Sequence, residues 1–185
     1  MSKKVVEVLL RQIYRKWFKM SEIHKNQRVG VFVDVQNMYY SAKNLYNAKV
    51  DFEKLLDKAV MNRKLVRASA YVIKADTPDE ENFFEALRKI GYEVKIKQLK
   101  EFYSGDKKGD WDLGMSVDMI QQAKKLDTVV LVTGDGDFAV LVDHLKAMGC
   151  RVEVMSFGRS SAKEIRESAT NFIDMDENQD RFLVK

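Results

Sequence analysis

The stretch VVLVTGDGDF, residues 129–138, indicates both the fold and the chemistry of this 185-residue chain. Four apolar residues form a strand-sized run, and the turn that follows carries Asp135 and Asp137 among two glycines. Carboxylates at the end of a buried strand are costly to desolvate, so this arrangement usually serves chemistry. The pattern recurs near the amino end, where the run VGVFV, residues 29–33, ends in Asp34. Each of these strands therefore delivers an acid at its carboxyl end.

Strand-like and helix-like runs alternate from Val29 onward, which is typical of a parallel sheet with helices on both faces. The expected strands are residues 29–33, 66–73, 93–97, 129–133 and 152–157, with a short edge strand at 171–173. The expected helices lie near residues 50–62, 79–90, 112–125 and 138–148. We therefore predict an α/β fold of three α/β/α layers, with a central, mainly parallel sheet of five or six strands.

Charge and periodicity divide the chain into three regions. We expect a basic amphipathic helix within residues 1–27, the α/β domain in residues 28–175, and a loose polar tail in residues 176–185. In the first region Val5, Leu9 and other apolar residues recur at helical spacing, opposite basic side chains. This helix is expected to dock on its own domain or to form a homodimer. Binding to a membrane surface or to the RNA backbone is the alternative use of such a helix.

Composition excludes several classes of protein. Cys150 is the only cysteine and the chain has two histidines, which rules out an intrachain disulfide and argues against a zinc cage. The apolar runs are strand-sized, and the amino end lacks the pattern of a signal peptide. We therefore expect a cytoplasmic protein without stable membrane insertion.

The acids are expected to gather at one edge of the sheet. In an open parallel sheet, ligands bind where the strand order reverses, so Asp34 and Asp135 converge if their strands are neighbours there. Asp112 suits the amino end of a helix, where a carboxylate is favoured. Asp118 lies among apolar residues of the same segment, where an aspartate needs a partner or a metal.

Such a cluster predicts a divalent cation. Several carboxylates at short range cannot all stay ionised without a cation, because like charges raise one another's pKa. Ligation by oxygen alone favours Mg²⁺ or Mn²⁺ over Zn²⁺. These ions activate water and assist in-line phosphoryl displacement, so the expected chemistry is hydrolysis of a phosphate ester.

Three ordered motifs resemble a known family. They are Asp34-x-x-Asn37, then Lys108-Gly109 leading to Asp112 and Asp118, then Thr133 to Phe138. Over roughly residues 28–174 the chain resembles the NYN domains, in particular the LabA-like group of the PIN-like nucleases. The resemblance implies a PIN-like three-layer fold and a metal-dependent ribonuclease, expected to be an endoribonuclease. It departs from the usual pattern at Gln36, where glycine is common, and at Asp110-Trp111, which lengthens the approach to Asp112.

The resemblance also implies roles for individual residues. The core metal ligands would be Asp34, Asp118 and Asp135. Asp137 would complete the cluster directly or through water, and Asp112 would belong to the same rim. Asn37 and Thr133 would orient ligands or substrate, so the expected catalytic set is Asp34, Asn37, Asp118, Asp135 and Asp137.

The expected substrate is single-stranded RNA. Residues 95–108 carry five lysines beside Phe102 and Tyr103, which suits phosphates and unstacked bases; a solvated sheet edge is the alternative. Tyr39 and Tyr40 follow Asn37 closely enough to edge the site, although at least one of them is expected to serve helix packing instead. The residues expected to contact substrate are Thr133, Lys74, Lys100, Tyr103, Lys107, Lys108, Arg159 and Ser160.

Two other functions stay open at this level. One is a regulatory module of the same fold that binds RNA or protein without catalysis, or that acts only within an assembly. The other is a phosphatase of the haloacid dehalogenase type, suggested by the acidic turn at residues 134–136. That chemistry requires a second aspartate two residues after the aspartate nucleophile. If Asp34 is the nucleophile, this second position is occupied by Gln36.

Overall fold

The computed structural model describes residues 25–74, 80–98, 100–101, 107–108 and 110–184. The helix expected within residues 1–27, and with it the homodimer expected through that helix, lies outside these residues, as does Tyr103. No helix in the described part of the chain is long and apolar enough to span a membrane.

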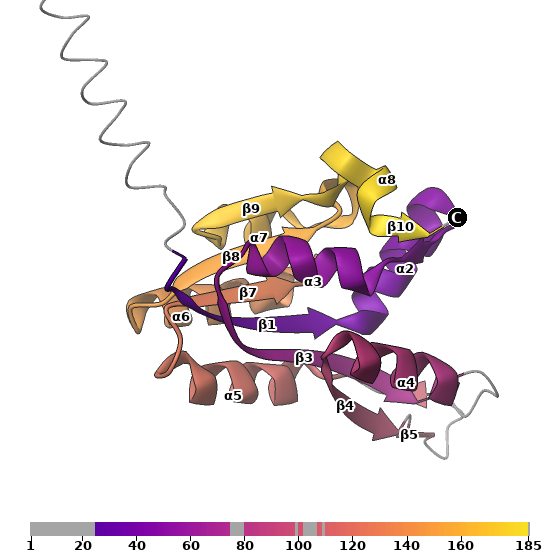
Figure 1. Cartoon of the computed structure of the whole chain (residues 1–185), viewed down its shortest axis with the longest axis horizontal. Helices are drawn as coiled ribbons and strands as arrows, with labels where there is room; N and C mark the ends of the chain where they lie inside the picture. The colour runs from indigo at the N-terminus through magenta and orange to yellow at the C-terminus, as the bar shows by residue number, and fades with distance from the viewer. Residues whose placement is uncertain (1–24, 75–79, 99, 102–106, 109, 185) are drawn as a thin grey trace, which may run out of the picture.

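A six-stranded parallel sheet forms the centre of the molecule (Figure 1). Its strand order is β4-β3-β1-β7-β8-β9, and every pairing in it is parallel. The strands are β1 (Arg28–Asp34), β3 (Lys64–Lys74), β4 (Glu93–Gln98), β7 (Thr128–Val132), β8 (Arg151–Ser156) and β9 (Asn171–Asp174). The predicted α/β fold is confirmed, and each predicted strand overlaps an observed one.

Helices cover both faces of this sheet, which gives the three predicted layers (Figure 1). The helices packed on one face are α2 (Val35–Tyr46), α3 (Phe52–Val60) and α4 (Glu80–Ile90). The helices on the other face are α5 (Asp112–Ala123), α6 (Ala139–Ala147) and α7 (Lys163–Ser168). The sequence pattern did not predict α2, because one side of this helix carries polar residues in place of a wide apolar stripe.

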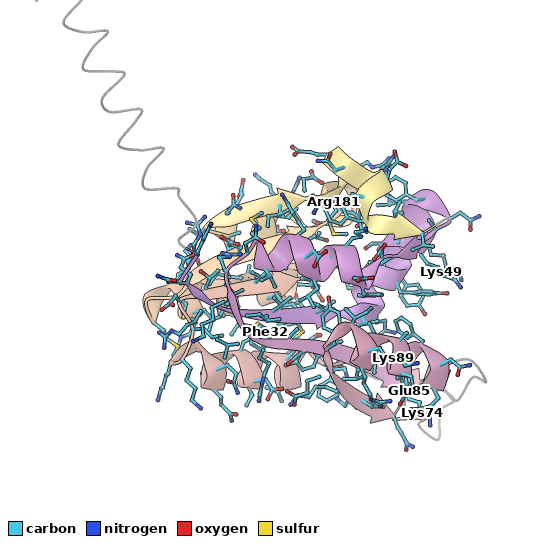
Figure 2. The ribbon with its side chains drawn as sticks, in the orientation of Figure 1. Phe32, Lys49, Lys74, Glu85, Lys89 and Arg181 are labelled. Carbon is cyan, nitrogen blue, oxygen red and sulfur yellow. The ribbon has the colours of Figure 1, made fainter. Side chains whose placement is uncertain are left out.

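Alternation along the central strands builds two separate cores. Val29, Val31 and Val33 of β1 pack with α2 and α3, whereas the intervening Phe32 packs with Met115 of α5. Figure 2 shows Phe32 on the α5 side of β1. Because side chains alternate across a strand, a strand covered on both faces is apolar at nearly every position. This requirement explains the continuous apolar runs in the sequence.

The carboxyl-terminal segment is ordered, so the prediction of a loose tail is wrong. It consists of the 3₁₀ turn η3 (Met175–Asn178), α8 (Gln179–Phe182) and β10 (Leu183–Val184). β10 pairs antiparallel with β2 (Lys49–Val50). The Phe182 side chain is buried in the same core as α2 and α3, and the Phe182 carbonyl accepts a hydrogen bond from the Asp51 N–H at 2.8 Å. The buried Phe182 ring and the backbone pairing are enough to hold this segment on the domain. Neither produces a periodic apolar pattern in the sequence, so the sequence did not indicate them.

A second small sheet pairs β5 (Lys100–Glu101) with β6 (Lys107–Lys108) in antiparallel register. It leads from β4 toward α5, and Lys100 lies opposite Lys108. The backbone of three predicted RNA-contacting lysines, Lys100, Lys107 and Lys108, therefore lies in this two-stranded sheet, which precedes α5 in the sequence.

Candidate metal centre

The acids meet at the point where the strand order reverses. From β1 the chain proceeds outward through β3 to β4, whereas β7 lies on the other side of β1 and continues to β8 and β9. Val33 of β1 pairs with Val132 of β7, so the residues that follow these strands lie side by side. The neighbour relation on which the predicted convergence of Asp34 and Asp135 depends is confirmed.

Asp34 is held by two elements at once. One carboxylate oxygen caps α2 by accepting the Asn37 N–H at 3.0 Å, and the other accepts the Thr133 hydroxyl at 3.3 Å. Asn37 in turn accepts the Gly134 N–H on its amide oxygen at 2.9 Å. The Thr133 oxygen also accepts the Asp135 N–H at 3.2 Å. These bonds tie the end of β1 to the turn after β7 and fix the direction of the Asp34 side chain.

Glycines let this turn lie against the loop after β8. A Cβ atom on Gly134 would come within 3.0 Å of the hydroxyl oxygens of Ser156 and Ser161. A Cβ atom on Gly136 would come within 3.0 Å of the Ala162 methyl group. The turn continues into η1 (Gly136–Phe138), where the Asp135 carboxylate accepts the Asp137 N–H at 3.0 Å. The glycines thus serve close packing.

Asp112, Asp135 and Asp137 form the acidic cluster, in which one carboxylate oxygen from each residue lies within 4.8 Å of the others. Asp112 opens α5, and the other two come from the turn after β7. Asp112 and Asp135 are half-buried, and Asp137 is exposed. The donor set is oxygen only, which fits a hard divalent ion such as Mg²⁺ or Mn²⁺.

The protonation of the neighbouring acids reflects the crowding of negative charge. Burial, with smaller contributions from the charges of Asp112 and Asp135, raises the pKa of Asp34 to about 6 against the opposing effect of its hydrogen bonds. The pKa of Asp112 is also raised, first by burial and then by the charges of Asp110, Asp135 and Asp137. A bound cation would reverse these shifts by favouring the ionised carboxylates.

Asp118 lies outside the acidic cluster and has partners of its own. Its carboxylate accepts the Tyr71 hydroxyl at 2.9 Å and lies 3.3 Å from the Lys95 ammonium group. Asp112 and Asp118 are six residues apart on α5, so their side chains point about 120° apart around the helix axis. The expectation that Asp118 needs a partner is met by Tyr71 and Lys95. The metal-ligand role implied for it by the resemblance is therefore in competition with a structural one.

A cavity of about 410 Å³ adjoins the acidic residues. It is lined by α2, the end of β3, residues 110–112, Asp135 and Ser160. The lining includes Asp34, Asn37 and Asp112 from the predicted site. Ser160 is therefore placed at the site, where its hydroxyl lies 2.9 Å from that of Ser41.

The other predicted substrate residues occupy varied positions. Lys74 ends β3, next to Ile73 of the cavity wall. Arg159 does not line the cavity; its guanidinium group lies 4.8 Å from the Tyr46 ring centre and 3.6 Å from the Asp176 carboxylate. The predicted contact of Arg159 with substrate stays a prediction.

Sequence reasoning missed part of the cavity wall. Tyr71, Ser41 and Asn44 line it, and none was singled out from the sequence. Gln36 and Trp111 also line it, whereas the sequence marks them only as departures from a family pattern. One signal was available for α2, because Gln36, Tyr40 and Asn44 recur every four residues. Tyr71 carried no such signal, since an aromatic residue in a buried strand is ordinary.

Fold and site together define a class: a Rossmann-like α/β/α domain with an acidic, oxygen-only site at its topological switch point. Residues 28–176 match the NYN domain. The chain is 31% identical over 159 residues to the low amplitude and bright protein LabA of Synechococcus elongatus, covering 81% of this chain and 84% of that protein. A solved structure of a protein of unknown function from Vibrio parahaemolyticus superposes with a TM-score of 0.80 at 33% identity, covering 88% of this chain and 99% of that one. The chain belongs to the NYN domain family.

Proposed function

We propose that this protein is a metal-dependent ribonuclease that hydrolyses phosphodiester bonds of single-stranded RNA, with Mg²⁺ or Mn²⁺ as its cofactor. The observation that carries the proposal is the acidic cluster of Asp112, Asp135 and Asp137, whose oxygens lie within 4.8 Å of one another beside the half-buried Asp34. The match of residues 28–176 to the NYN domain supports the same reading.

The chain's own residues have distinct tasks in this proposal. The acidic cluster and Asp34 hold the cation, which when bound supplies an activated water and neutralises charge on the phosphate. Asn37 and Thr133 keep the site in register by bonding the Gly134 N–H and the Asp34 carboxylate. Because these bonds are in place without substrate, the carboxylates need little reorganisation when the phosphate arrives.

A matched cleavage assay tests the proposal. The wild type, Asp135→Asn, Asp34→Asn and the surface control Asp143→Asn are incubated with labelled single-stranded RNA in Mn²⁺, Mg²⁺ or EDTA. The Asp143 side chain is 66% exposed on α6, and its ion-pair partner among the described residues is Lys146. We expect the wild type and Asp143→Asn to cleave the RNA in Mn²⁺ or Mg²⁺ and not in EDTA. We expect Asp135→Asn and Asp34→Asn to lose this cleavage. Equal cleavage by all four proteins would overturn the proposal.

Mn²⁺ titration of the same four proteins distinguishes a nuclease from the alternative of a non-catalytic regulatory module. A thermal shift by Mn²⁺ in the wild type that is lost in Asp135→Asn, without cleavage of any RNA offered, would assign the site to a binding module instead of a nuclease.

A further inference from the structure

The cavity beside the acidic cluster extends beyond the acids, where aromatic side chains and side-chain amides line it. Asp34, Asp112 and Asp135 form its acidic end, and α2 supplies most of the rest. Its volume of about 410 Å³ falls within the range of roughly 300–1,000 Å³ that is usual for small-molecule sites. Since bases in a duplex are paired and stacked, a recess of this size accepts one unpaired nucleotide unit and excludes a helix.

A polar and aromatic stripe on α2 faces this recess. Gln36, Tyr40 and Asn44 recur every four residues, which places them along one side of the helix, and all three line the cavity. Tyr40 is 50% exposed. Within the described residues, neither the Gln36 nor the Asn44 amide has a hydrogen-bond partner. Each amide offers two donors and an acceptor, the groups that read the edge of an unpaired base.

Trp111 forms a rigid part of the same wall. Its indole N–H donates to the Val72 carbonyl at 2.8 Å, and its ring lies edge-on to Tyr71 with centroids 5.3 Å apart. The Lys97 ammonium group lies 5.6 Å from the ring centre and donates to the Asp110 carbonyl. β3 and β4 thus fix a large aromatic side chain next to the acids before any ligand binds, which lowers the ordering cost of binding.

Gly114 makes this position of the indole possible. A Cβ atom there would lie 2.7 Å from Cε3 and 2.9 Å from Cζ3 of Trp111, closer than real contacts allow. The ring therefore rests directly on the backbone of α5. Tyr71, which supports the other side of this arrangement, is itself held by Asp118. Asp118 is a positioning residue in this chain of contacts, since it acts on the cavity through Tyr71 and Trp111.

We propose that the cavity is a subsite for one unpaired nucleobase of the RNA, next to the phosphate that lies at the acidic cluster. The base stacks on Tyr40 and is confined by Trp111, while Gln36 and Asn44 read its edge. The proposal rests on the proposed nuclease function, because it places the base relative to a phosphate bound at the acids. It predicts that one position of the RNA, and no other, is sensitive to the loss of its base.

Binding in a cleavage-deficient background tests this proposal separately from catalysis. The full chain carrying Asp135→Asn is titrated, at fixed Mg²⁺, against fluorescein-labelled single-stranded RNA and a series in which each nucleotide in turn is abasic. Tyr40→Ala and Tyr39→Ala are added singly to this background. Tyr39 is the matched control because it is the adjacent tyrosine, is 44% exposed and, unlike Tyr40, does not line the cavity. Its ring lies edge-on to Tyr40 with centroids 5.3 Å apart, so Tyr39→Ala removes a neighbour of Tyr40 without removing a ring from the cavity wall.

We expect Tyr40→Ala to weaken RNA binding by roughly 5- to 100-fold, the usual worth of one base–aromatic stack, and Tyr39→Ala to leave it within about twofold. One abasic position should weaken the parent protein by a similar factor and have no further effect in Tyr40→Ala. Gly114→Ala, which displaces Trp111, should weaken binding at that same position. A change of Gln36→Ala should alter the relative affinities for the four bases there.

Two results would overturn the proposal. One is equal RNA affinity of the Tyr40→Ala and Tyr39→Ala proteins. The other is a free nucleoside monophosphate that occupies the cavity and is not displaced by RNA, which would assign the site to a small nucleotide. If the wild type fails to cleave RNA but the Tyr40 and abasic effects coincide, the nuclease function fails and the base subsite stands.

Discussion

The Thr133 hydroxyl donates a hydrogen bond to the Asp34 carboxylate at 3.3 Å, although ninety-nine residues separate the two in the chain. The bond spans the ends of β1 and β7, the two strands between which the sheet reverses its order. The bond holds in place a carboxylate that is half-buried and close to other acids. The charge that Asp34 would need to bind a cation therefore destabilises the metal-free fold.

Asp34→Asn should therefore stabilise the metal-free protein. In the unfolded chain the pKa of Asp34 is 3.8, and in the fold it is about 6. Between these values the folded protein binds the proton more tightly, so the contribution of Asp34 to stability falls as pH rises from about 4 to 6. At pH 7 the penalty is about 3 kcal/mol, at about 1.4 kcal/mol for each unit by which the pKa is raised, and asparagine removes it. Urea unfolding in EDTA from pH 4 to 8 measures it, and an Asp34→Asn curve parallel to the wild-type curve would contradict the prediction.

Divalent ions should stabilise the fold through the acidic cluster. Mn²⁺ at about 100 times its Kd raises the free energy of unfolding by about 2.7 kcal/mol if only the folded state binds it. Thermal melts of the wild type and Asp143→Asn should rise with Mn²⁺, whereas those of Asp135→Asn should not. The same Mn²⁺ response in Asp135→Asn would remove that residue from the ion site.

Asp112→Asn and Asp118→Asn distinguish the two acids of α5. Asp112 shares the acidic cluster, so its change should weaken Mn²⁺ binding at least about tenfold, the loss of one charged ligand. Asp118 pairs with Lys95 and Tyr71 instead, so its change should leave Mn²⁺ affinity nearly unchanged and cost at most about 1 kcal/mol of stability. Calorimetric Mn²⁺ titration measures both. A comparable loss of affinity in the two variants would restore Asp118 as a ligand.

Phe182→Ala should destabilise the protein strongly. The ring is 2% exposed in the core that contains α2 and α3, and emptying such a site costs about 3–5 kcal/mol. Val184→Ala is the matched control, since Val184 is 51% exposed in the adjacent strand β10 and should change stability by less than about 0.5 kcal/mol. Urea unfolding compares the two variants, and equal midpoints would show that the carboxyl-terminal segment contributes nothing to the core.

The longer helices that the sequence pattern predicted differ in one respect from α2, which it did not predict. α3 carries Leu55, Leu56 and Ala59 on one buried side, so its apolar period is visible in the sequence. α2 buries only a narrow set that includes Met38 and Ala42, because its other side lines the cavity. A helix that lines a polar site carries polar residues on part of its surface, so the apolar period by which helices are recognised in a sequence is weaker.

The sequence by itself determined the alternation of strands and helices, the acids that follow β1 and β7, and the family. These features are local, since a strand buried on both faces is apolar along nearly its whole length and an acid at its end stands out. Only the tertiary structure decided that Asp112 joins Asp135 and Asp137 while Asp118 turns to Tyr71. The rotation of α5 on the sheet decides between two acids on one helix, and that rotation depends on packing with residues far away in the chain. The same holds for the cavity, whose wall comes from α2, β3 and the start of α5.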